Sequence, residues 1–125
     1  MKNYDPLKDP NATEWLDLDE QERVQLVVDY HRRKRIDLPN RMVHAAFHAA
    51  VENQLAEGIP DVRCALSRLI VEGLDRHAAI QAIGSLVAAC AWSALQPEAS
   101  GTDLNEAYLE NLRKFSADEW LKKAR

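Results

Sequence analysis

Three side chains that can bind a metal or carry a proton recur at a spacing of four residues in one segment of the chain. His44, His48 and Glu52 lie within the run V-H-A-A-F-H-A-A-V-E-N-Q. On an α-helix, where each residue turns by about 100°, they form one ridge that spans roughly 80°. His77 and Gln81 have the same spacing near the start of a later predicted helix. Two such sets on packed helices can converge on one point.

The ridge lies at the edge of an apolar helix face. Val43, Phe47, Val51 and Leu55 span about 120° of the predicted helix, and the ridge that contains the histidines lies directly beside them. A polar side chain at the border of a core needs a hydrogen-bond or metal partner, because burying it unpaired is costly. We therefore expect each of these polar side chains to have a partner.

Three kinds of partner would satisfy the cluster. A divalent metal would be held by His44, His48, Glu52 and His77, a mixed nitrogen and oxygen site suited to zinc, iron, manganese or nickel. Gln81 would then be a further ligand or would support one. Internal hydrogen bonds are the second possibility, with Glu52 holding one imidazole and Gln81 another. A carboxylate or peptide ligand is the third, and the residues leave all three open.

Motifs that indicate catalysis are absent from the sequence. No serine or cysteine lies in a nucleophile motif, and there is no glycine-rich phosphate loop. The residues between His44 and His48 are Ala-Ala-Phe, so the H-E-x-x-H motif of metalloproteases is absent too. We expect a non-catalytic protein in which the cluster organises the core or binds a metal. The alternatives are a metal-dependent enzyme with an open coordination position and a protein-interaction module.

Size and composition predict one ordinary domain over residues 1–125. The chain has 125 residues, of which 46% are hydrophobic and 29% charged, which is enough for a packed core. A net charge of −4 argues against a general polyanion binder, and no apolar run approaches the roughly 18 residues of a membrane span. The polar first ten residues, with two prolines, resemble neither a signal nor a transit peptide, so a cytoplasmic location is expected. A protein partner or a homo-oligomer remains open.

The hydrophobic periodicity predicts an all-α fold, a compact bundle of five to six helices, with no strand signal. An irregular arm over residues 1–16 precedes it, pinned to the body by Trp15 and Leu16, and residues 96–125 form a C-terminal helical extension. The expected helices cover residues 20–35, a segment capped by Asp37 or Asn40 that ends at Glu57, 60–73, 76–95, a segment from Thr102 or Asp103 after a loop at Ser100, and a short helix from Ser116. Gly84 lies inside the fourth helix, where a glycine costs about 1 kcal/mol against alanine, so we expect close approach to the second helix there.

Two further features have a plain structural interpretation and a functional alternative. The basic run from His31 to Arg35 ends the first helix, where cations complement the helix dipole and are usually solvated. Nucleic-acid binding is the alternative, and His31 is also a candidate for the buried stripe of that helix. Cys64 and Cys90 lie in alanine-rich helical segments, and neither belongs to a C-x-x-C motif. This favours two small buried side chains in a reduced compartment, and a redox or metal role is the alternative.

Two motifs, H-A-A-F-H-A-A-V-E-N-Q-L and R-L-I-V-E-G-L-D-R-H-A-A-I-Q-A-I-G, resemble a family of small bacterial proteins defined as a domain of unknown function. The resemblance covers about residues 41–88. The family pattern, H-x-x-x-H-x-x-x-E followed by G-L-x-R-H-x-A-I-H-x-I-G, maps onto His44, His48, Glu52 and His77. Its last histidine falls on Gln81, a poor metal ligand, which weakens a four-ligand site. The resemblance implies an all-helical fold and a bacterial, cytoplasmic origin, and it implies no activity.

Overall fold

The computed structural model describes residues 1–99, 101 and 103–123, and all regular structure within them is helical, as predicted. It consists of seven α-helices and a short 3-10 helix: α1 (Ala12–Asp17), α2 (Glu20–Arg33), α3 (Arg41–Ala56), α4 (Pro60–Val71), α5 (Arg76–Ala94), η1 (Pro97–Ala99), α6 (Leu104–Lys114) and α7 (Ala117–Lys123). Ser100, Thr102 and the last two residues of the predicted extension, 124–125, lie outside the described residues.

Several helix ends follow the capping signals in the sequence, but α3 does not: Asn40 is at its N-cap without a side-chain cap hydrogen bond. Asp19 and Glu22 form the predicted capping box, with the Asp19 carboxylate accepting from the Glu22 N–H at 2.8 Å. The Asp75 carboxylate caps α5 by accepting from the N–H of Ala78 at 2.8 Å. Gly73 follows α4 with φ +116°, a left-handed conformation that glycine adopts without strain. These local signals fix where α5 begins, and with it the position of His77.

The N-terminal arm is more ordered than the irregular segment predicted for residues 1–16. Residues 12–17 form α1, because the side chain of Asn11 accepts from the N–H of Glu14 at 3.0 Å and caps a helix too short to show periodicity. Trp15 is fully buried, and its indole N–H donates to the Asn53 side chain of α3 at 2.9 Å. Trp15 therefore pins the arm to the body as predicted, whereas Leu16, expected to do the same, is exposed.

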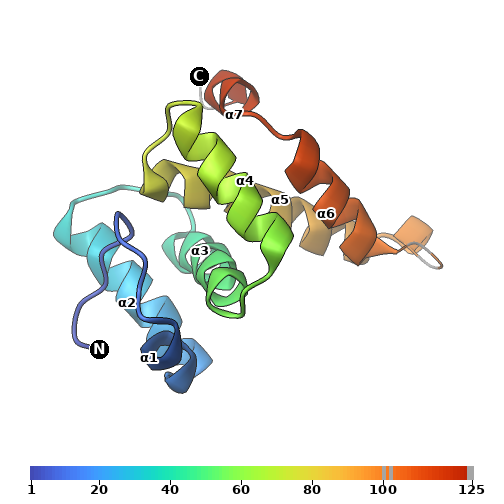
Figure 1. Ribbon diagram of the computed structural model, residues 1–125. Helices are drawn as coiled ribbons and strands as arrows, with labels where there is room; N and C mark the ends of the chain where they lie inside the picture. The colour runs from blue at the N-terminus through green and yellow to red at the C-terminus, as the bar shows by residue number, and fades with distance from the viewer. Residues whose placement is uncertain (100, 102, 124–125) are drawn as a thin grey trace.

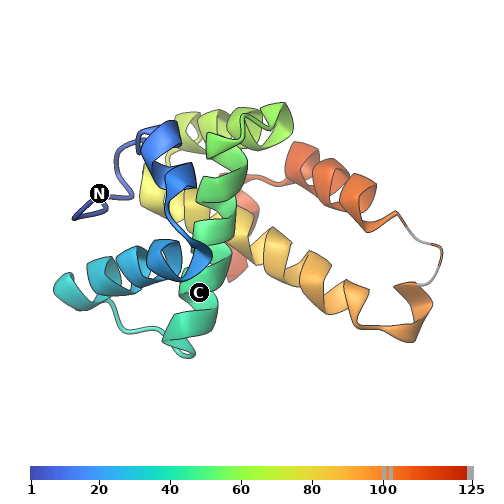
Figure 2. The same ribbon diagram turned by 90° about the horizontal axis from the view of Figure 1, so that it is seen from below.

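Helix α3 separates two hydrophobic cores (Figure 1). The arm, α1 and α2 pack on one side of it, around Tyr4, Trp15 and Val27. On its other side it packs with α4, α5, α6 and α7, around residues such as Leu69 and Ile80. In Figure 2 the green α3 crosses the yellow start of α5 near the centre of the molecule, while the rest of α5 runs outward beside α6. The end of α2, the middle of α3 and the start of α5 thus come together.

The glycine of α5 marks the close helix approach that the sequence predicts. Gly84 is buried, and a Cβ added to it would lie 3.7 Å from the carbonyl carbon and oxygen of Phe47 on α3. This is ordinary van der Waals contact, so the site holds a methyl group but leaves little room for a longer side chain. The two helices that carry the histidines are therefore closely packed.

The prediction that both cysteines are buried is wrong. Cys64 is exposed and Cys90 is half-buried, and both are free thiols. On α4 the buried positions are Val62, Ala65 and Leu66, so Cys64 falls on the solvent side of that helix. The alanine-rich composition around the cysteines does not specify which helix face they occupy.

Helix α5 is, in the described part of the chain, the one helix long and apolar enough to cross a membrane by length and composition. It packs against α3 and contributes Ile80 and Ile83 to a hydrophobic core. A central core helix meets the same criterion, so this feature is weak evidence for a membrane span.

Candidate metal centre

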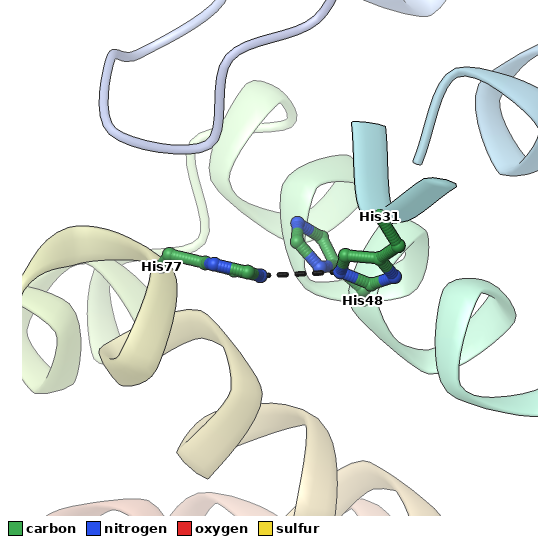
Figure 3. A group of neighbouring side chains, drawn as sticks. All are labelled: His31, His48 and His77. Carbon is green, nitrogen blue, oxygen red and sulfur yellow. Dashed lines mark hydrogen bonds between the residues drawn. The ribbon is translucent and has the colours of Figure 1, made fainter. Parts of the chain in front are cut away.

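Three imidazole rings from three different helices converge in the interior (Figure 3). His31 comes from the last turn of α2, His48 from the middle of α3, and His77 from the first turn of α5. One nitrogen of each residue can be chosen so that all three lie within 4.8 Å of one another. His31 and His48 are buried and His77 is half-buried. We refer to these three residues as the histidine triad.

The geometry within the histidine triad is close to that of a metal site. The Nε2 atoms of His31 and His77 are 3.2 Å apart and share a hydrogen bond, drawn as the dashed line in Figure 3. Two nitrogens on a tetrahedral zinc, each about 2.0–2.1 Å from the metal, are separated by about 3.3 Å. The ring centroids of His48 lie 5.6 Å from His31 and 5.3 Å from His77. The nitrogens of His31 and His77 thus already have the separation of two zinc ligands, and the three nitrogens together lie within 4.8 Å of one another.

Behind His48 lies a buried ion pair. The carboxylate of Glu52, which is fully buried, accepts two hydrogen bonds from the guanidinium of Arg76, both at 2.8 Å. Its Oε2 also accepts the hydroxyl proton of Tyr4, which comes from the N-terminal arm. Arg76 additionally donates to the carbonyl of Pro6 at 2.9 Å and forms an ion pair with Asp9. The N-terminal arm and α5 therefore both fix the position of the Glu52 carboxylate.

This arrangement determines which nitrogen of His48 carries the proton. Burial and the nearby charge of Glu52 raise the pKa of Tyr4 well above 10, so the phenol stays protonated. The single hydroxyl proton goes to Glu52, and the Tyr4 oxygen therefore accepts from Nε2–H of His48, 2.8 Å away. The Nδ1 atom of His48 is then left with a free lone pair. It is buried and has no hydrogen-bond partner. His48 is thus presented to the interior as a neutral ligand of fixed tautomer.

All three imidazoles favour the neutral form. Burial lowers the pKa of His31 to about 4, assisted by the neighbouring charges of His77, His44 and Arg41. Burial also lowers the pKa of His48 well below 6.5, with His77 and His31 as further causes. The pKa of His77 is lowered by burial and partly restored by Asp75 and Asp5. Neutral imidazole is the form that ligates metals, so near pH 7 no proton has to be displaced.

The histidine triad shares two residues with the ligand set predicted from the sequence. His48 and His77 belong to it, whereas His44, Glu52 and Gln81 do not. His44 is exposed, in the first turn of α3 where Met42 and Val43 are exposed as well. Glu52 is occupied by its ion pair, and Gln81 lines a neighbouring cavity.

His31 is the member of the histidine triad that the predicted four-residue site missed. The signal for it was its position on the buried stripe of α2, in register with Val27 and Val28, rather than its place in the basic run. The four residues that follow it, 32–35, are exposed, as expected for a solvated helix end. The basic run therefore divides into one buried imidazole and a charged surface segment.

A cavity of about 390 Å³ lies beside the histidine triad. His31 and His48 line it, together with His44, Gln81 and Ser85 as further polar side chains. The remaining wall comes from apolar residues and Gly84, and includes Trp120 of α7. Two of the three residues of the triad, His31 and His48, therefore border a space large enough for a small molecule.

Comparisons with known proteins identify no relative of this chain. No protein-family model, no curated protein and no solved structure matches the chain. The resemblance to a bacterial domain of unknown function stays a prediction.

Proposed function

We propose that this protein binds a divalent transition metal through His31, His48 and His77. The observation that carries the proposal is the convergence of three neutral imidazoles from three helices, one of them with a buried nitrogen lone pair that no hydrogen bond uses. Imidazole ligands suit zinc, nickel and iron, whereas manganese prefers oxygen ligands. Because Glu52 is engaged by Arg76, the donor set contains no carboxylate, and manganese fits it less well.

A hydrogen-bonded structural cluster is the competing explanation, and it accounts for fewer of the contacts. In that explanation Glu52 would hold one imidazole and Gln81 another. Glu52 instead reaches His48 through the hydroxyl of Tyr4, and the Nδ1 atoms of His48 and His31 are buried without partners. A buried polar atom without a partner costs about 1–3 kcal/mol. A metal ion would use the free lone pair of His48, so this unpaired atom favours the metal explanation.

The outer contacts of the site also resemble those of a metal centre. Ligating histidines commonly donate their second N–H to an oxygen that fixes the ring, and loss of such a contact weakens metal binding by about 10–100-fold. Here His48 donates to Tyr4, which in turn donates to Glu52. A metal at the triad would join α2, α3 and α5, and so link the two hydrophobic cores.

Metal analysis of protein purified without a histidine tag or chelator tests the proposal. We expect about one equivalent of zinc, nickel or iron, and a thermal midpoint that rises when zinc is added to the stripped protein. His48→Ala and His77→Ala should each lose most of the metal, while the exposed His44→Ala should retain it. Stripped protein that neither binds nor is stabilised by any of these metals would exclude the proposal. Equal losses in His44→Ala and His48→Ala would place the metal elsewhere.

The cavity favours a second candidate function, a metal-dependent hydrolase. Three protein ligands leave the fourth position of a tetrahedral zinc for water, whose pKa falls to about 7 on the metal. Hydrolysis of small activated esters by the zinc-loaded protein tests this candidate. A rate no faster than that of His77→Ala at the same total zinc would remove the enzyme and leave metal binding intact.

A further inference from the structure

The cavity and the histidine triad share a wall. His31 and His48 belong to both, so a molecule in the cavity lies against two of the three proposed ligands. With three imidazoles bound, a tetrahedral metal has one position left for an exogenous ligand. We take the side of the metal not covered by the three helices to be the side of the cavity.

Most of the cavity wall is apolar. Leu38 comes from the segment before α3, Phe47 from α3 itself, Ala88 from α5 and Trp120 from α7. A cavity of 390 Å³ falls within the range of sites that bind small molecules, roughly 300–1,000 Å³. The wall therefore fits a compact apolar body better than a sugar or a phosphate ester, which need many polar contacts.

The charges around the triad favour an anion at its polar end. Three neutral imidazoles leave the two positive charges of a divalent metal uncompensated, and the buried carboxylate of Glu52 is neutralised by Arg76. The charges of Asp75 and Asp5 act on His77, but neither residue lines the cavity. Arg41 adds positive charge that acts on His31, and its buried Nε has no hydrogen-bond partner. None of the described residues that line the cavity is acidic. An anionic group would thus meet attraction from the metal and no repulsion from the walls.

We propose that the cavity binds a small carboxylate with an apolar body, whose carboxylate oxygen takes the open metal position while its body lies against Phe47 and Trp120. This inference rests on the proposed metal binding. Carboxylate oxygen is a normal zinc ligand, and the apolar body gains free energy by leaving water. Metal, apolar wall and absence of acidic lining residues together specify this class of ligand.

Calorimetric titration of zinc-loaded protein, with its zinc content measured first, tests the proposal. Hexanoate is the probe, and hexanol and hexylamine are controls that share its apolar chain. We expect hexanoate to bind at least about tenfold more tightly than either control, and to lose that advantage in the zinc-free protein. Equal affinities for hexanoate and hexanol, or an affinity for hexanoate that does not depend on zinc, would overturn the inference and leave metal binding intact.

Two neighbouring alanines allow a test of whether hexanoate binds in the cavity. Ala88 lines the cavity, whereas Ala89 is exposed on the same helix. Ala88→Phe should fill the space and weaken hexanoate binding by more than about tenfold while zinc remains stoichiometric, and Ala89→Phe should change neither. Equal hexanoate affinity in the two variants would place the ligand elsewhere. If Ala88→Phe does not fold, the zinc dependence in the unmodified chain decides. A wild-type chain that binds no zinc would overturn the proposed function as well.

Discussion

Replacing Tyr4 by phenylalanine removes one oxygen atom on which the orientation of His48 depends. The Tyr4 hydroxyl accepts from Nε2–H of His48 and donates to Glu52. The Tyr4 ring packs against Trp15, with their ring centroids 5.3 Å apart. Phenylalanine keeps the ring contacts and deletes both hydrogen bonds. Tyr30 offers a matched control, because its ring belongs to the same core and its hydroxyl makes no hydrogen bond within the described part of the chain.

The size of the effect follows from the groups left without partners. In Tyr4→Phe the buried Nε2–H of His48 has no acceptor, which costs about 1–3 kcal/mol of stability. Glu52 keeps its two hydrogen bonds from Arg76, so the ion pair should survive. Without the hydroxyl the proton of His48 is no longer confined to Nε2. We therefore expect zinc affinity to fall by about 10–100-fold, the usual effect of losing a partner that orients a ligand.

Two measurements separate the effect on stability from the effect on metal binding. Urea unfolding in the presence of a chelator gives the free energy of unfolding, and competition with a chromophoric chelator gives the zinc affinity. Tyr30→Phe should change the free energy of unfolding by less than about 0.5 kcal/mol and leave the zinc affinity unchanged. If Tyr4→Phe and Tyr30→Phe bind zinc equally well, Tyr4 does not orient a metal ligand, and the tautomer assigned to His48 is wrong.

Three further predictions concern pH and packing. Without metal, stability should be full above pH 6.5 and fall as the pH is lowered to 4, because the unfolded chain binds protons in this window that the folded chain does not bind. His31 alone accounts for about 3 kcal/mol of this loss, and the lowered pKa values of His48 and His77 add to it. A flat profile of thermal midpoints over this window would contradict the burial of these imidazoles. Arg76→Ala should destabilise by about 3–5 kcal/mol in urea unfolding by leaving Glu52 charged and unpaired, whereas Arg113→Ala, which breaks only exposed pairs, should change the stability far less. Similar losses of unfolding free energy in the two arginine variants would show that Glu52 and Arg76 do not form a buried ion pair. Gly84→Ala should be neutral or stabilise by up to about 1 kcal/mol, and Gly84→Leu should destabilise by about 1–3 kcal/mol, with thermal midpoints as the readout; unchanged midpoints in the leucine variant would mean that α5 does not pack on α3 there.

The local signals in the sequence predicted the helices well. The Asp19–Glu22 capping box and the glycine after α4 act over a few residues, so their effects can be read without the fold. The apolar face predicted for α3 was only partly right: Val51 and Leu55 are buried but Val43 is exposed, and His48, predicted at the border of the core, lies inside it. α1 was missed because six residues are too few for a periodic pattern, and only the cap at Asn11 indicates it.

The composition of the site depended on contacts between distant segments. Glu52 has the register of a ligand, but Tyr4 and Arg76, 48 and 24 residues away, bind its carboxylate. The spacing of His31 with Val27 and Val28 indicates that it is buried, but only the packing of α2 across α3 brings it to the other two histidines. His44 lies on the same helix face as His48, but the first turn of α3 is exposed, as Met42 and Val43 also show. The spacing within α3 does not reveal how much of the helix is covered by the rest of the fold. The sequence thus predicted a histidine cluster but not the identity of all its members.

Diffraction from a crystal grown with zinc, recorded at the zinc absorption edge, tests the metal site most directly. We expect one anomalous peak about 2.0–2.1 Å from a nitrogen of each of His31, His48 and His77, with Nδ1 as the ligand atom of His48. Its fourth neighbour should be water or an exogenous ligand on the side of the cavity. A peak at His44 or at the exposed Cys64, or no peak between the three rings, would contradict metal binding by the histidine triad.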